Sequence, residues 1–156
     1  MYDFIDRPIT DLNHGGRVLI WSMRSWVKAM GERTCPASVV ASAFARWNML
    51  PGLQPFLRAM ALFNRHGLEN FQFCPLQCNH VSEHEAIIVS LLRALREERP
   101  EAVRTTLALL VEEEALGDLI VSLTRLGETM VAAGVFPDRI AARQAPSASN
   151  PATRLQ

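Results

Sequence analysis

The chain has 156 residues, of which 49% are apolar and 21% are charged. This is the composition of one globular domain and not of a disordered protein. Its sixteen basic residues balance its sixteen acidic residues, so no net positive charge draws it to nucleic acid or to an anionic membrane. No run of about 18 uncharged apolar residues predicts a transmembrane helix. We therefore expect neither nucleic acid nor a membrane among its partners.

The N-terminus and the cysteines bear on the compartment. Asp3 and Asp6 stand where a secretory signal peptide carries basic residues. The three cysteines are an odd number, which favours reduced thiols in the cytoplasm over a framework of disulfides. All basic residues except Lys28 are arginines, a bias typical of GC-rich bacterial genes. The sequence thus predicts a cytoplasmic, bacterial protein.

Apolar residues recur at helical spacing along most of the chain, and no alternating pattern predicts a strand. Pro36 and Pro100 are typical of a first helical turn, and Ser82 with Glu85 forms a capping box. The fold class that follows is all-α, a single-domain bundle of about six helices in orthogonal or mixed packing. We expect an irregular arm over 1–15 and a helical domain over 16–139, with helices over 16–30, 36–49, 53–66, 82–98, from Pro100 onward, and over 116–133.

The last predicted helix and the segment that follows it lead to two further expectations. Its apolar residues keep a 3-4-3-4-3 spacing, which is typical of a bundle seam: Leu116, Leu119, Leu123, Leu126, Met130 and Ala133. A seam that one domain does not fully cover predicts a homodimer with this helix or the helix over 36–49 at the interface. Residues 140–156 are rich in Ala, Ser, Pro and Arg and predict a disordered tail.

Two charged groups of residues are interpreted as solvated. Arg17, Trp21, Arg24 and Lys28 share one face of the first helix, opposite its apolar stripe. Such a face can stack on a base or on a partner, but with zero net charge we favour solvated cations and a Trp21 packed under another element. The acids Glu112–Glu114 stand before the last helix, where they stabilise its dipole.

The strongest chemical signal is the spacing Cys-x3-Cys-x-His-x3-His, formed by Cys74, Cys78, His80 and His84. Two thiolates and two imidazoles are a complete ligand set for zinc. His84 shares a helix face with Ile88, so its ring is expected to point inward. The pairs lie closer together than in zinc fingers, and a remote residue such as Cys35 or His66 can replace one ligand. Alternatively, the cysteines are small buried apolar residues and the histidines polar residues at a helix start; a Cys74–Cys78 disulfide is a third option.

The stretch His80-Val81-Ser82-Glu83-His84 resembles the H-x-x-E-H signature of the inverzincin metallopeptidases. The resemblance covers five residues and implies zinc binding by His80 and His84, with Glu83 as the base that activates water. It further implies that Glu112, Glu113 or Glu114 supplies the last ligand. It requires a helix that begins before His80, whereas the capping box begins the helix at Ser82.

Three functions follow from these patterns. The first is a non-enzymatic binding protein that acts as a homodimer or on an unidentified protein partner. The second is a metal- or redox-responsive regulator that uses Cys74, Cys78, His80 and His84. The third is a small metal-dependent hydrolase built on His80, His84 and Glu83. No catalytic residue and no cofactor other than a possible zinc ion is assigned.

Overall fold

The computed structural model describes residues 3–138, and within this range the chain folds into six α-helices. The predicted all-α bundle is therefore confirmed. The helices are α1 (His14–Gly31), α2 (Pro36–Arg46), α3 (Leu53–His66), α4 (Glu83–Arg96), α5 (Pro100–Ala108) and α6 (Leu116–Ala132). Three short 3-10 helices lie between them: η1 (Ile9–Asp11), η2 (Leu50–Gly52) and η3 (Glu113–Ala115). The predicted tail over 140–156 lies outside the described residues.

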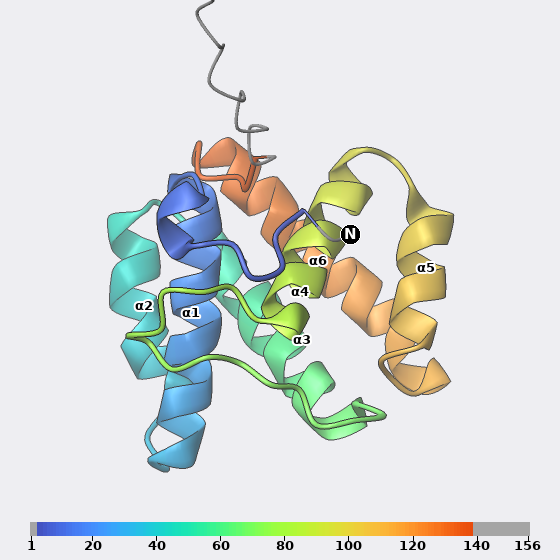
Figure 1. Cartoon of the computed structure of the whole chain (residues 1–156), viewed down its shortest axis with the longest axis horizontal. Coiled ribbons are helices and arrows are strands. Elements are labelled where there is room, and N and C mark those ends of the chain that lie inside the picture. Colours follow the sequence, from blue (N-terminus) through green and yellow to red (C-terminus); the bar gives the residue numbers. More distant parts are fainter. Residues whose placement is uncertain (1–2, 139–156) are drawn as a thin grey trace, which may run out of the picture.

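Helix α6 packs against α3, α4 and α5, while α1 packs against α2 and α4 (Figure 1). Its seam is buried, with Leu119, Leu123, Leu126 and Met130 at most 1% exposed. One chain thus covers the seam completely, because α3 and α4 both pack on it. The seam itself leaves no apolar surface for a second subunit.

The N-terminal arm is shorter than predicted. Helix α1 begins at His14, two residues early, because the Asn13 side chain accepts a hydrogen bond from the Gly16 N–H and caps the helix. The arm also contains η1 and pairs with the segment before α4. Asp6 donates its backbone N–H to the Val81 carbonyl at 3.0 Å, and Val81 donates in return to Arg7.

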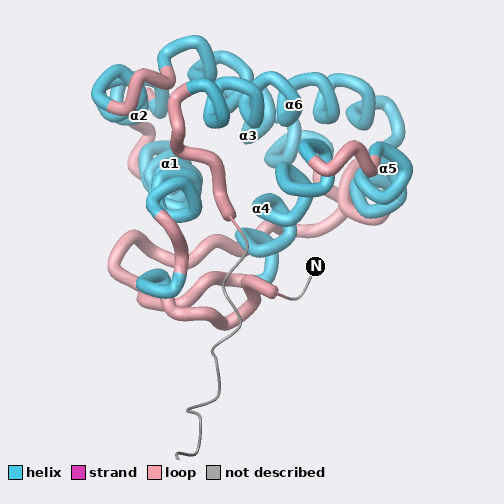
Figure 2. The backbone as a smooth tube through the Cα atoms, turned by 90° about the horizontal axis from the view of Figure 1, so that it is seen from above, coloured by secondary structure: helices cyan, strands magenta, loops and turns pink. Residues whose placement is uncertain are grey.

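The long loop between α3 and α4, residues 67–82, crosses α1 and lies beside the N-terminal arm (Figures 1 and 2). It contains the Cys/His cluster. No helix in the described part is long and apolar enough to cross a membrane.

Candidate functional site

A buried ion pair organises the loop that contains both cysteines. Arg24 on α1 is 3% exposed and Glu85 on α4 is fully buried. The Arg24 Nε lies 2.7 Å from Glu85 Oε1, and an Nη2 hydrogen bond to Oε2 at 3.0 Å makes the pair bidentate. We call this pair the Arg24–Glu85 clamp, since it joins α1 to α4 through two residues that are 61 positions apart in the sequence.

The clamp holds the loop through its backbone. The remaining three N–H groups of Arg24 donate to carbonyl oxygens of Pro75, Cys78 and His80 at 3.1, 2.7 and 2.6 Å. All five donors of the guanidinium are thus satisfied, as a buried Arg requires. Burial by itself lowers the pKa of Arg24, but the hydrogen bond and the charge of Glu85 raise it by more. The net shift of the pKa is upward, so the group stays charged.

Glu85 serves the clamp and the helix cap together. Its carboxylate accepts the backbone N–H of Ser82 at 2.9 Å, which confirms the predicted capping box. It also accepts the N–H of Cys74 at 3.2 Å. The ends of the cysteine segment are therefore fixed by one carboxylate. The interpretation of Arg24 as a solvated cation is wrong, because the 74–80 loop covers that face of α1 and supplies acceptors there.

The rest of that face matches the expectation. Trp21 packs edge-on against Trp47 of the turn after α2, with ring centroids 5.6 Å apart. Lys28 is exposed and forms only a surface pair with Glu32 at 3.9 Å.

Cys74 and Cys78 are both free, both half-buried and hydrogen-bonded to each other through their sulfurs. The two thiols differ in acidity. Burial, the hydrogen bond to Cys78 and the charge of Glu85 raise the pKa of Cys74 to about 11. A hydrogen bond from the backbone of His80, followed by the Cys74 thiol, lowers the pKa of Cys78. The site thus pairs a thiol that ionises readily with a neighbour that keeps its proton.

His84 points inward, as expected, but both of its ring nitrogens are occupied. Nδ1 lies 3.0 Å from the backbone N–H of Gln72, which donates to it, and Nε2 lies 3.0 Å from Glu69 Oε1. Phe71 packs on the ring at a centroid distance of 4.7 Å. In this arrangement His84 ties the first half of the loop to α4, just as the clamp ties the second half.

The predicted zinc ligands do not converge. Within residues 3–138, no three of Cys74, Cys78, His80 and His84 have ligand atoms within 4.8 Å of one another. Only the two thiols are brought together, and His80 is exposed at an isolated backbone bridge to Pro8. Binding of zinc at these residues stays a prediction that would require the loop to rearrange.

The helix geometry that the inverzincin signature requires is also different. Helix α4 begins at Glu83, so His80 lies outside it and cannot share a helix face with His84. Glu112 and Glu114 lie beside His66 and not beside His84.

Sequence reasoning missed Arg24, because helical spacing shows which residues share a face but not which loop covers that face. The capping box fixed the place of Glu85 at the start of α4, but it gave no sign of a partner on α1. No family model, no curated protein and no solved structure matches the chain.

Proposed function

We propose that the protein is a thiol-based redox-responsive regulator in which Cys78 is the reactive thiol and Cys74 the resolving thiol. The observation that carries the proposal is the contact between two unequal thiols in a loop that the Arg24–Glu85 clamp holds in place. A thiolate that is accessible and lies next to a second thiol is typical of redox sensors. In the cytoplasm predicted from the sequence, disulfides are usually transient and redox-sensing.

The chemistry needs a hydroperoxide as the oxidant. The Cys78 thiolate attacks one peroxide oxygen, the O–O bond breaks, and the other oxygen leaves as an alcohol or water after taking up a proton. Cys78 is then a sulfenic acid. The Cys74 sulfur attacks the Cys78 sulfur, its proton goes to the leaving hydroxyl, and water is released as the disulfide forms. Two thiols lose two electrons and the peroxide gains them.

Formation of the disulfide acts on the clamp. The new bond restrains a segment whose carbonyls at Pro75 and Cys78 bind Arg24 and whose N–H at Cys74 binds Glu85. Any shift in that backbone changes hydrogen bonds that reach α1 and α4 directly. The oxidation state is in this way communicated from a surface loop to two core helices.

The test treats tag-free Cys35→Ser protein with hydrogen peroxide, since Cys35 is an exposed thiol that would otherwise report too. We expect a Cys74–Cys78 disulfide, seen by mass spectrometry as the loss of two hydrogens and reversed by dithiothreitol. Cys74→Ser should stop at a Cys78 sulfenic acid that dimedone traps, and Cys78→Ser should not react. Equal reactivity of both single variants, or a loop with unchanged hydrogen exchange after oxidation, would overturn the proposal.

A second candidate is the homodimer, and the outward face of α6 favours it. Val121, Arg125, Glu128 and Ala132 form an exposed stripe along this helix, opposite the buried seam. In an antiparallel two-fold contact centred between positions 126 and 127, Arg125 faces the partner's Glu128 and Val121 faces the partner's Ala132. This stripe is self-complementary in charge and in apolar character, as an isologous interface requires.

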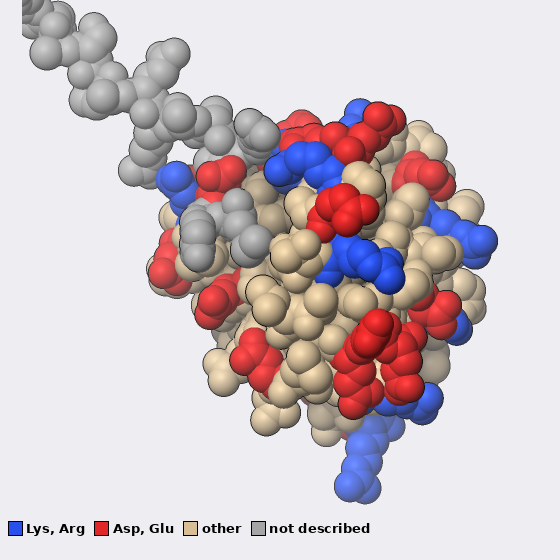
Figure 3. All heavy atoms as spheres, turned by 90° about the vertical axis from the view of Figure 1, so that its right-hand side faces the viewer, with Lys and Arg blue, Asp and Glu red and all other residues tan. Residues whose placement is uncertain are grey.

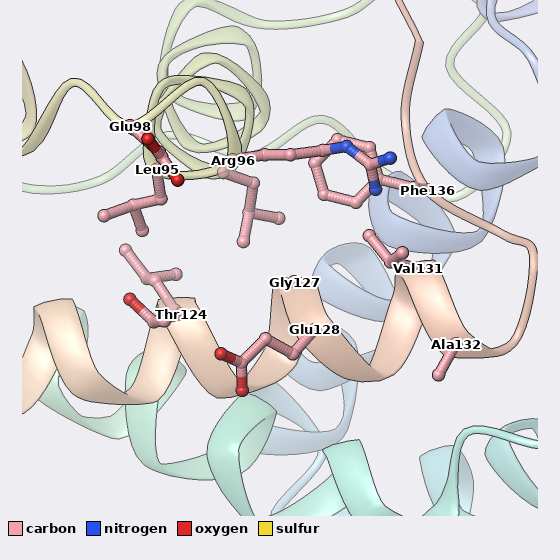
Figure 4. Close-up of a pocket in the computed structure, with 11 residues that line it drawn as sticks. Leu95, Arg96, Glu98, Thr124, Gly127, Glu128, Val131, Ala132 and Phe136 are labelled. Carbon is pink, nitrogen blue, oxygen red and sulfur yellow. The ribbon is translucent and has the colours of Figure 1, made fainter.

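An apolar groove of about 440 Å³ opens beside this stripe, between α4 and α6 (Figure 4). Arg96 lies over the Phe136 ring at its far wall, 4.9 Å from the centroid, and Glu128 and Val131 line the α6 side. The antiparallel contact brings the partner's Val121 to the Ala132 end of this groove. The face drawn in Figure 3 carries acidic and basic side chains among uncharged residues.

Sedimentation equilibrium at tens of micromolar tests the dimer. Arg125→Glu should weaken association, and Arg125→Glu combined with Glu128→Arg should restore it, since the exchange of charges keeps the complementarity. Arg104→Glu on α5 is the matched control, because Arg104 is equally exposed on another helix. A wild-type chain that stays monomeric would remove this candidate and leave the redox proposal untouched.

A further inference from the structure

A second group of ligand-type side chains lies at the C-terminal end of α3, away from the cysteines. His66 is the last residue of α3, and Glu112 and Glu114 flank the start of η3. His66 Nδ1 lies 2.8 Å from Glu112 Oε2 and 3.4 Å from Glu114 Oε1. The three ligand atoms all lie within 4.8 Å of one another, and this is the one such group among residues 3–138.

The backbone fixes the position of the group. Glu112 donates its N–H to the His66 carbonyl at 2.9 Å, and Leu68 donates to the Leu110 carbonyl at 2.8 Å. Gly67 lies between them, opposite Val111. A Cβ on Gly67 would lie 2.7 Å from the Phe63 carbonyl oxygen and 3.0 Å from the Phe71 ring, so a larger residue here would have to shift the end of α3 or the loop that follows it. His66 and Glu112 are therefore held opposite each other by a short antiparallel ladder.

The separations suit a metal ion. Bond lengths of about 2.0–2.2 Å at tetrahedral angles place neighbouring ligand atoms roughly 3.4 Å apart. The Nδ1 atom of His66 lies 2.8 Å from Glu112 Oε2 and 3.4 Å from Glu114 Oε1, and the second of these separations equals this value. The ring nitrogen that faces the two carboxylates is partly shielded, since the His66 side chain is 19% exposed. The imidazole is thus oriented toward one point that both carboxylates share.

The charges at this point also favour a cation. Nδ1 carries at most one proton, so it can donate one strong hydrogen bond to one of the two carboxylates. Glu112, at 2.8 Å, is the better placed acceptor. Glu114 approaches the same nitrogen at 3.4 Å and brings a second negative charge near the first. The two side chains are 52% and 73% exposed, so water screens part of the repulsion between their carboxylates. A divalent ion relieves this repulsion and uses all three ligands.

We propose that His66, Glu112 and Glu114 bind a divalent transition-metal ion, best matched by Zn²⁺, with at least one coordination position left open. The two carboxylates are hard ligands that many divalent ions accept, whereas the imidazole is a borderline ligand that suits zinc better than Ca²⁺ or Mg²⁺, which prefer oxygen alone. Three protein ligands with an open fourth position are typical of zinc sites that bind water or an anionic ligand. The site is separate from the dithiol and does not depend on it.

Equilibrium dialysis against Zn²⁺ tests the site on tag-free Cys74→Ser/Cys78→Ser protein, in which the other predicted ligands are disabled. We expect one zinc per chain. Glu112→Gln, Glu114→Gln and His66→Gln should each lower the affinity at least about tenfold, since even outer-shell partners of a metal contribute that much. Glu113→Gln is the matched control, because Glu113 is the neighbouring glutamate that does not belong to the group.

Two outcomes would overturn the proposal. One is the absence of zinc uptake, which would leave His66 as the centre of an ordinary surface ion pair. The other is an equal loss of affinity in the Glu113 and Glu112 variants, which would mean adventitious binding to acidic surface. If the double cysteine variant does not fold, the wild-type chain titrated with Co²⁺ decides: a cobalt–thiolate charge-transfer band that accounts for all the bound metal, with the same affinity in Glu112→Gln, places the metal at the cysteines alone and refutes the site at His66.

Discussion

The Arg24–Glu85 clamp gives the sharpest prediction, because both partners are buried and their contacts are fully defined. Arg24→Met removes a bidentate ion pair and leaves three loop carbonyls without their donor. Breaking one side of a buried pair costs about 3–5 kcal/mol. Glu85 keeps the N–H groups of Cys74 and Ser82 as donors, so we expect about 3 kcal/mol, a large share of a total stability of roughly 5–15 kcal/mol.

The assay is urea unfolding followed by circular dichroism. With an m value of about 1.5 kcal/mol per molar urea, a loss of 3 kcal/mol lowers the midpoint by about 2 M. Arg24→Lys should fall between wild type and Arg24→Met, because a single ammonium group cannot reach Glu85 and three carbonyls together. If Arg24→Met does not fold, the lysine variant still reports the effect.

A double-mutant cycle with Glu85→Gln isolates the interaction from other consequences of each change. The double variant should lose less stability than the sum of the single variants, since the second change removes a charge that the first left unpaired. Lys28→Met on the same helix is the control and should cost less than about 0.5 kcal/mol, because its pair with Glu32 is exposed. Coupling below about 0.5 kcal/mol would refute the claim that the clamp holds the loop.

Three further outcomes follow from the structure. Iodoacetamide at pH 8 should label Cys78 well before Cys74, because a pKa of about 11 leaves roughly one Cys74 thiol in a thousand ionised at that pH; peptide mapping over a pH series checks this, and equal rates would contradict it. His84→Ala should cost about 1–3 kcal/mol in urea unfolding, because it removes the acceptor of the Gln72 N–H and the ring that packs on Phe71, whereas His80→Ala at an exposed position should cost little. Gly15→Ala should lower the melting temperature, since a Cβ there would overlap the backbone of the segment that follows α6; an unchanged melting temperature would show that this segment does not pack as described.

Local sequence determined the helices, because the signals that form them act within a few residues. Pro36 and Pro100 stand in the first turns of α2 and α5, and the expected bounds of the helix over 53–66 match α3. The capping box of Ser82 and Glu85 was readable for the same reason. The contact between Cys74 and Cys78 was also within reach, since only three residues separate them and a turn between Pro75 and Cys78 brings them together.

The contacts of Arg24 and His66 were decided by the tertiary structure alone. Arg24 lies 61 residues from Glu85, and His66 lies 46 residues from Glu112. Helical periodicity places Arg24 on the polar face of α1, but only the course of the 74–80 loop over that face makes it buried. The burial of the α6 seam is of the same kind, because the seam could face either a second chain or its own neighbours. Burial and long-range pairing depend on which surfaces meet, and a pattern along one segment does not contain that information.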